Sequence, residues 1–163
     1  MDFSAKGQDL LKQIESLRLK PYNDQTGQDI SSWVRGATIG YGHLILQNEW
    51  DVYKNGITKA QAEQLFADDS VPYVNGVNGG LKVEVQQHQF DAMVILTYNI
   101  GVPNFLSSSA LKLINDPNAQ TNYSSLESAW KAWNRSQGRV TQGLINRRNA
   151  EWKIYSQGIY ETW

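Results

Sequence analysis

The segment Glu15-Ser-Leu-Arg-Leu-Lys-Pro-Tyr-Asn-Asp24 lies where a helical pattern of apolar residues gives way to a sheet pattern. Up to and into this segment, apolar residues recur at intervals of three and four, which predicts a helix over Ser4–Leu17, and Pro21 disfavours its continuation. Downstream, turn-forming residues are followed by short apolar segments around Trp33 and over Thr38–His43. These segments predict a small antiparallel sheet with glycine-rich turns.

Helical patterns dominate the rest of the chain. Thr58-Lys-Ala-Gln61 has the form of a capped helix start, and Pro72 is the first helix break after it. The buried face of this helix is predicted to comprise Ala62, Leu65, Phe66 and Val71. Further helices are predicted over Gln86–Tyr98, Ser108–Ile114, Ser124–Trp133 and Gly143–Tyr155. A small sheet followed by a helical bundle belongs to the α+β class.

The length of 163 residues and the hydrophobic content of 40% predict one compact domain with two lobes that share a helix. A sheet-containing lobe would occupy residues 15–70, and a helical lobe would occupy residues 1–14 and 71–163. The chain has no cysteine, and its two histidines, His43 and His88, lack the paired spacing of metal ligands. We therefore expect no disulfide, no metal and no cofactor.

The N-terminus lacks a basic start followed by an apolar stretch, and no segment approaches the roughly 20 apolar residues of a membrane span. We therefore expect a protein that is made in the cytosol without a signal peptide or a transmembrane segment.

The charges are unevenly distributed along the chain. The formal net charge is −1, yet between Lys131 and Lys153 there are six basic residues against one acid, Glu151. This segment predicts either a polyanionic partner, such as a wall polymer or a membrane surface, or a solvated helix face. Nucleic-acid binding is poorly supported, because the net charge is near zero and no recognition motif occurs.

Two carboxyl groups of the opening segment have different environments, as hydrolysis of a glycosidic bond requires. Glu15 lies among apolar residues at the C-terminal end of the first predicted helix. Apolar neighbours and the negative end of the helix dipole both raise the pKa of such a carboxyl, as a general acid requires. Asp24 lies nine residues later in a polar turn, where a carboxylate stays ionised. The same positions also suit a solvated glutamate and a turn-forming aspartate.

Together with Thr38-Ile-Gly-Tyr-Gly-His-Leu44, the segment Glu15–Asp24 resembles the signature of the phage-type lysozyme family, which includes many phage endolysins. The resemblance continues in order along most of the chain. It covers Gly56–Phe66, Phe90–Val94, Tyr98–Gly101, Phe105, Ser108-Ser109, Trp130, Trp133-Asn134 and Gly143–Glu151. The resemblance implies a lysozyme-like α+β fold with the active-site cleft between the sheet lobe and the helical lobe.

The catalytic roles of the family carry over to three residues. The resemblance implies that Glu15 is the general acid, that Asp24 assists the attacking water and that Thr38 helps to place this water. Inversion at the sugar carbon would require a carboxyl separation of about 6.5–9.5 Å, whereas retention corresponds to about 5 Å. Thirteen residues, Gln25–Ala37, separate Asp24 from Thr38, more than in compact family members, so Thr26 is the alternative to Thr38.

Other residues carry over by their position in the family pattern. His43 is implied to form a structural ion pair with Asp69 of the helix that joins the lobes. The implied substrate-binding residues are Leu44, Tyr98, Ser108 and Arg139. Arg139 is implied to lie near the general acid, with Arg147 or Arg148 as its alternative if the register differs.

The resemblance implies an endolysin, a muramidase that hydrolyses the β-1,4 bond between N-acetylmuramic acid and N-acetylglucosamine of peptidoglycan and lyses the host cell. It further implies a monomer that reaches the wall through a holin-type membrane pore. One alternative is a lytic transglycosylase, which cuts the same bond with one acidic residue; Asp24 argues against it. The other alternative is permeabilisation of the outer membrane by the basic segment Lys131–Lys153.

Overall fold

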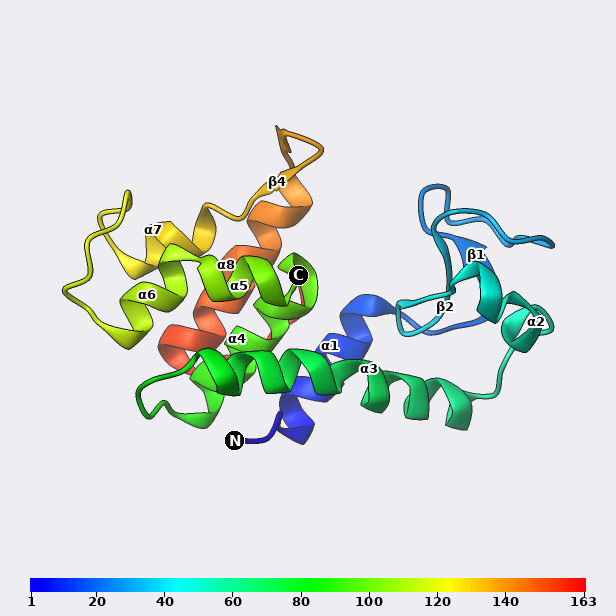
Figure 1. The fold of residues 1–163 in the computed structure, drawn as a ribbon, viewed down its shortest axis with the longest axis horizontal. Coiled ribbons are helices and arrows are strands. Elements are labelled where there is room, and N and C mark those ends of the chain that lie inside the picture. The colour runs from blue at the N-terminus through cyan, green and yellow to red at the C-terminus, as the bar shows by residue number, and fades with distance from the viewer. The chain divides into compact units, whose positions relative to one another are not determined.

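A computed structural model describes all residues from Met1 to Trp163 (Figure 1). The chain forms two compact units, one comprising Lys12–Val71 and the other comprising Met1–Leu11 together with Pro72–Trp163. Below, Lys12–Val71 is called the sheet unit and the remainder is called the helical unit. Helices and two small antiparallel sheets make up the chain, which confirms the predicted α+β class.

The sheet unit contains a three-stranded antiparallel sheet in the order β1-β2-β3. The strands are β1 (Arg18–Asn23), β2 (Ala37–Gly40) and β3 (His43–Leu44). Helix α1 (Ala5–Glu15) leads into β1, so the first predicted helix is confirmed and ends two residues earlier than expected. The elements after β3 are the 3-10 helix η1 (Gln47–Glu49), α2 (Trp50–Tyr53) and α3 (Lys59–Gly80).

The connection between β1 and β2 is anchored in the core of the sheet unit. The indole Nε1 of Trp33 donates to the carbonyl of Ile45 (2.9 Å). Trp33 and Ile30 pack on the buried core of this unit, which comprises Ala37, Ile39 and Ile45. The predicted strand around Trp33 is therefore wrong: its side chain is used for packing, and β1 supplies the pairing partner of β2.

The long helix α3 starts as predicted but does not break at Pro72. Thr58 Oγ1 accepts from the Gln61 N–H (3.1 Å) and Gln61 Oε1 accepts from the Thr58 N–H (2.8 Å), which confirms the capped start. The helix continues through Pro72, so the predicted break is wrong. Pro72 removes one main-chain donor, and because Pro72 and Asp68 are both exposed, water can satisfy the freed carbonyl. Val71 is 51% exposed, against the prediction that it is buried.

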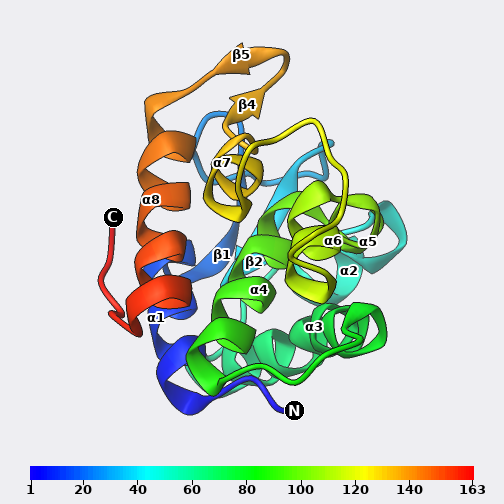
Figure 2. The same cartoon turned by 90° about the vertical axis from the view of Figure 1, so that its left-hand side faces the viewer.

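The helical unit is organised around the buried helix α4 (Gln87–Ile100). Every residue from Phe90 to Thr97 is buried, and the helix ends at Gly101, whose φ of 88° suits glycine. Helix α4 packs against α5 (Val102–Ser107) and α8 (Gln142–Gln157), as Figure 2 shows. The remaining elements are α6 (Ser109–Asn115), α7 (Leu126–Lys131), β4 (Arg135–Ser136) and β5 (Arg139–Val140). All four helices predicted here are confirmed, although α7 is shorter, whereas the sequence patterns do not predict α5 or the β4–β5 hairpin.

The buried carboxylate of Asp91 joins both ends of the chain to helix α4. Its oxygens accept hydrogen bonds from the Ser4 N–H (3.0 Å), the Gln87 side-chain amide (2.9 Å), the Tyr160 hydroxyl (2.5 Å) and the Ser4 hydroxyl. Burial, followed by the bond to Asp91, raises the pKa of Tyr160, so this phenol stays a neutral donor. The negative charge of Asp91 is thus stabilised by hydrogen bonds alone among its described contacts.

A second buried carboxylate, Glu151 on α8, pairs with two arginines of the same helix. Its oxygens accept from Arg147 Nε (2.9 Å), Arg148 Nη1 (2.7 Å) and Trp130 Nε1 (3.0 Å). Arg147 is 6% exposed, Arg148 is 1% exposed and Glu151 is fully buried. Two of the six basic residues between Lys131 and Lys153 therefore lie inside the protein. The prediction of a basic surface on this segment is wrong for these two, because their charges are paired in the interior.

Replacing Glu151 by Gln should destabilise the protein by about 3–5 kcal/mol, because a buried ion pair that loses one partner leaves an uncompensated charge. Urea unfolding followed by circular dichroism measures this loss. Glu161→Gln is the matched control: Glu161 faces Lys153 at 3.8 Å with its side chain 62% exposed, and such surface pairs contribute about 0–1 kcal/mol. Equal unfolding midpoints for the two variants would contradict the assigned role of Glu151.

Candidate active site

Glu15 is the last residue of α1, and contacts within the sheet unit fix where this helix ends. Ser16 follows in a left-handed conformation (φ 59°), and its N–H donates to the Lys12 carbonyl (3.1 Å). This conformation costs a non-glycine residue about 1–3 kcal/mol and persists where the surroundings impose it. Lys12 pairs with Glu63 of α3 (2.5 Å), which also accepts from the Tyr41 hydroxyl (3.0 Å). The bond to Lys12 lowers the pKa of Glu63, so Glu63 stays charged and holds α1 against α3.

The carboxyl group of Glu15 lies against the turn between β2 and β3. A Cβ atom on Gly42 would lie 3.0 Å from Glu15 Oε2, which is closer than such atoms ordinarily approach. Gly42 also has a φ of 82°, a conformation that favours glycine. The glycine-rich motif therefore allows the main chain to come close to the predicted acid.

Asp24 and Thr38 are brought together by one main-chain carbonyl. The oxygen of Gly36 accepts from the Asp24 N–H (3.1 Å) and from the Thr38 hydroxyl (2.9 Å). Gly36 has a φ of 92°, and a Cβ atom there would collide with Asp24 Oδ1. Since the Thr38 hydroxyl donates its only proton to this carbonyl, its oxygen remains able to accept from a water or a substrate hydroxyl.

The alternative residue Thr26 is used differently. Its hydroxyl oxygen accepts from the Gln28 N–H (3.2 Å), and its N–H donates to the Asn23 carbonyl (3.3 Å). These bonds close the exposed turn after β1. Thr38, and not Thr26, shares a hydrogen-bond acceptor with Asp24 in this structure.

One face of the sheet carries Thr38 together with two further side chains. Thr38 is the register partner of both Tyr22 on β1 and Leu44 on β3, and register partners present their side chains to the same face. Leu44, predicted to bind substrate, is 53% exposed, so it can contact a ligand. Tyr22 is half-buried and is absent from the sequence-based assignment.

Tyr22 lies in the electrostatic field of both predicted catalytic carboxyls. Burial raises its pKa most, Arg18 lowers it, and the charges of Glu15 and Asp24 raise it further. The signal that could have identified Tyr22 is strand periodicity, because it stands two residues before Asp24.

The other predicted substrate-binding residues belong to the helical unit. Ser108 is the N-cap of α6: its hydroxyl accepts from the Leu111 N–H (3.1 Å) and donates to the Phe105 carbonyl (2.7 Å), and the residue is 4% exposed. The Tyr98 ring centroid lies 4.7 Å from that of Tyr73. Arg139 is exposed on β5. Ser108 therefore has a clear capping role, and contacts of these three residues with a sugar stay a prediction.

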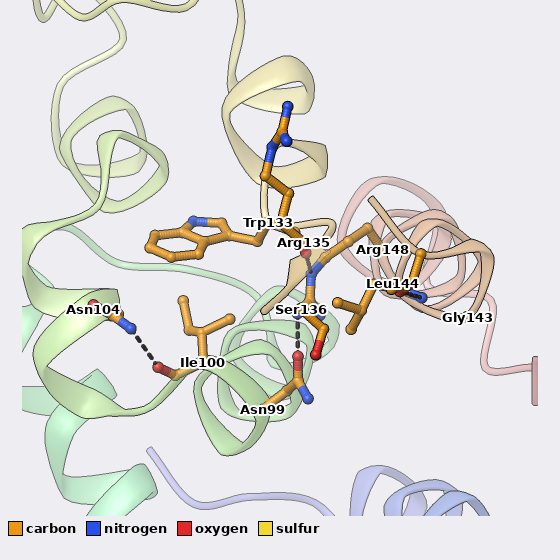
Figure 3. A pocket seen from close by; sticks show the side chains of 10 residues that line it. Asn99, Ile100, Asn104, Trp133, Arg135, Ser136, Gly143, Leu144 and Arg148 are labelled. Atoms are coloured by element: carbon orange, nitrogen blue, oxygen red, sulfur yellow. Dashed lines mark hydrogen bonds between the residues drawn. The ribbon is translucent and has the colours of Figure 1, made fainter. Parts of the chain in front are cut away.

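A pocket of about 580 Å³ opens in the helical unit (Figure 3). Its lining includes Trp133, Leu144, Arg135 and Arg148, together with amide and hydroxyl side chains and no acidic residue. Arg148 donates through Nε to the Trp133 carbonyl (2.6 Å) and through Nη2 to Asn99 Oδ1. Because Arg148 also pairs with Glu151, this arginine is committed to the fold.

His43 and Asp69 form a hydrogen-bonded pair within the sheet unit. His43 Nδ1 and Asp69 Oδ2 are 2.8 Å apart, and the His43 ring contacts the edge of Tyr53 with centroids 5.3 Å apart. The bond to Asp69 raises the pKa of His43, burial opposes it, and the charges of Asp69 and Glu49 add to the increase. The pair joins β3 to α3 and contacts none of the three predicted catalytic residues through a described bond.

The His43–Asp69 pair should make stability depend on pH. A raised folded-state pKa means that the contribution of His43 is fully present below its unfolded pKa of about 6.5 and is lost as the pH rises through the folded value. A double-mutant cycle with His43→Gln and Asp69→Asn should give a coupling of about 1–3 kcal/mol at about pH 5.5 and a smaller one at about pH 9. Urea unfolding at both pH values provides the measurement; a coupling that grows with pH would refute this assignment.

Comparison with known proteins gives a consistent result. The phage lysozyme family model matches residues 12–151 of this chain. The endolysin of Bacillus phage PZA is 40% identical over 159 residues, which cover 97% of this chain and 56% of that relative. This chain thus spans little more than half the length of that relative.

Two solved structures are similar over nearly their whole length. An endolysin from Escherichia coli O157:H7 phage FAHEc1 has a TM-score of 0.77 and 32% identity, covering 99% of this chain and 98% of that one. The muramidase domain of SpmX from Asticaccaulis excentricus has a TM-score of 0.73 and 27% identity, covering 96% of this chain and 98% of that one. These matches extend through both units.

Proposed function

Since the chain belongs to the phage lysozyme family, we propose that it is an endolysin-type muramidase that hydrolyses the β-1,4 bond between N-acetylmuramic acid and N-acetylglucosamine in peptidoglycan. The observation that carries the proposal is the arrangement of the sheet unit. Glu15 lies against Gly42, while Asp24 and Thr38 share the Gly36 carbonyl. The similarity to a muramidase domain supports the choice of bond.

Glu15 acts as the proton donor for the departing sugar oxygen. It stands at the last residue of α1, where the negative end of the helix dipole favours a protonated carboxyl. Its carboxyl group lies so close to the main chain at Gly42 that a Cβ atom there would lie 3.0 Å from Oε2. A carboxyl group positioned beside the departing oxygen can act as a general acid.

Asp24 and Thr38 hold the water that attacks the sugar carbon. Asp24 is exposed at the end of β1, so its carboxylate can accept a proton from this water, while the Thr38 oxygen accepts the second hydrogen. Both residues bind the Gly36 carbonyl, Asp24 through its main-chain N–H and Thr38 through its hydroxyl. A separate water site and a separate acid are the features of an inverting glycosidase.

The two units act as a single catalytic domain, because residues with family roles come from both. Leu44 in the sheet unit and Tyr98, Ser108 and Arg139 in the helical unit are proposed to bind the glycan strand. None of the helices combines the length and the apolar character that a membrane-spanning segment requires. We propose that the protein is made in the host cytoplasm and reaches the wall as a monomer through a holin-type pore.

Replacing Glu15 by Gln should reduce the clearing of purified cell walls by at least about 100-fold, because general acid catalysis contributes about 10²–10⁴ in rate. Asp24→Asn should reduce the rate of wall clearing by a similar factor. Turbidity of a wall suspension gives the rate, and circular dichroism verifies the fold. Glu84→Gln, a change at an exposed carboxyl outside the sheet unit, is the control. Retained activity in Glu15→Gln would sink the assignment.

Product chemistry separates hydrolysis from the transglycosylase alternative. We expect wall fragments with a free reducing N-acetylmuramic acid, released first as the α anomer because water attacks opposite the departing β oxygen. Mass spectrometry detects the fragments, and proton NMR during the first turnovers detects the anomer. Fragments lighter by one water would instead identify an anhydro product and a transglycosylase. A β anomer would indicate retention.

A further inference from the structure

The segment 25–36 forms an additional edge on the sheet beside Tyr22. Asp29 forms an antiparallel bridge with Tyr22, the Ile30 N–H donates to the Pro21 carbonyl (3.1 Å) and the Asn23 N–H donates to the Gln28 carbonyl (2.9 Å). Because Ile30 is also packed into the core of the sheet unit, this edge is held at both its main chain and its side chains.

Arg18 links this edge to the ring of Tyr22. Its guanidinium carbon lies 4.1 Å from the centroid of the Tyr22 ring, a cation–π contact. One terminal nitrogen of Arg18 donates to Asp29 Oδ1 (2.9 Å) and to the Gly27 carbonyl (3.0 Å). Arg18 is therefore clamped between the segment 25–36 and Tyr22, and it restrains the position of the ring.

Tyr22 shares its face of the sheet with Thr38, the residue that is proposed to hold the attacking water. Tyr22 stands next to Thr38 on one face of the sheet, and the negative charges of Glu15 and Asp24 both act on its phenol. The charged groups around it are Glu15 from α1, Arg18 from β1, Asp24 after β1 and Asp29 from the segment 25–36. A neutral phenol on this face of the sheet can donate a hydrogen bond to a carboxylate or to a water held there.

We propose that Tyr22 is a positioning residue of the active site, and that Arg18 and Asp29 of the lengthened segment hold it in place. The inference rests on the proposed function, since it concerns the same carboxyl groups. Tyr22 orients the reacting carboxyls and their water, while Asp29 acts only through Arg18 and Tyr22. The segment 25–36 thereby contributes to catalysis through the position of Tyr22.

A double-mutant cycle in kcat tests this chain of contacts. Tyr22→Phe keeps the ring under Arg18 and removes the hydroxyl, so kcat on soluble wall fragments should fall about tenfold with KM within about twofold, the pattern of a lost transition-state contact. Asp29→Asn should lower kcat about threefold by loosening Arg18. The double variant should be no slower than Tyr22→Phe, because residues that act through one another are not additive.

Asp51→Asn is the matched control. Asp51 pairs with Lys54 at 3.1 Å and lies outside the site. This pair is more exposed to solvent than the Arg18–Asp29 pair. The kcat of the Asp51→Asn variant should therefore equal that of the wild type. Thermal unfolding confirms that every variant is folded. Wild-type kcat in Tyr22→Phe, or a double variant slower by the product of the single effects, would overturn the inference alone. An inactive wild type would overturn the proposed function and this inference with it.

Discussion

The carbonyl oxygen of Gly36 accepts a hydrogen bond from the Asp24 main chain and another from the Thr38 side chain. Thirteen residues separate the two in the sequence, and the pairing of β1 with β2, in which Tyr22 lies opposite Thr38, brings them close. Glycine suits this position because its φ is 92° and because it has no side chain to meet the Asp24 carboxylate. The proposed water site therefore depends on a main-chain atom that no substitution can remove.

The lengthened connection between β1 and β2 has a structural explanation in the same region. Trp33 and Ile30 anchor it in the core of the sheet unit, and Asp29 pairs with Arg18. A connection fixed by buried side chains loses little additional entropy when it positions a neighbouring group. Extra length therefore does not imply looseness here, and it gives β1 a partner on its otherwise open edge.

Buried charge organises the helical unit. Glu151 draws Arg147 and Arg148 into the interior, and Asp91 gathers Ser4, Gln87 and Tyr160. Buried carboxylates must be fully paired or hydrogen-bonded, so each specifies which elements meet around it. The pairing of the two arginines also reduces the positive charge that α8 can offer to a membrane.

Local patterns in the sequence determined the start of α3, the position of α4 and α8 and the glycine-rich turn. Each of these features depends on residues within a few positions of one another, so apolar periodicity or a capping pattern predicts it directly. Tertiary structure alone decided that α3 continues through Pro72, that Arg147 and Arg148 are buried, and that Tyr22 stands beside Thr38. Each outcome depends on a partner that is distant in the sequence or lies outside the chain. Strand β2 places Thr38 beside Tyr22, the Glu151 carboxylate holds the two arginines inside the bundle, and solvent reaches the exposed turn of α3 at Pro72. Packing across the whole chain sets these partners, so the residues alone do not predict them.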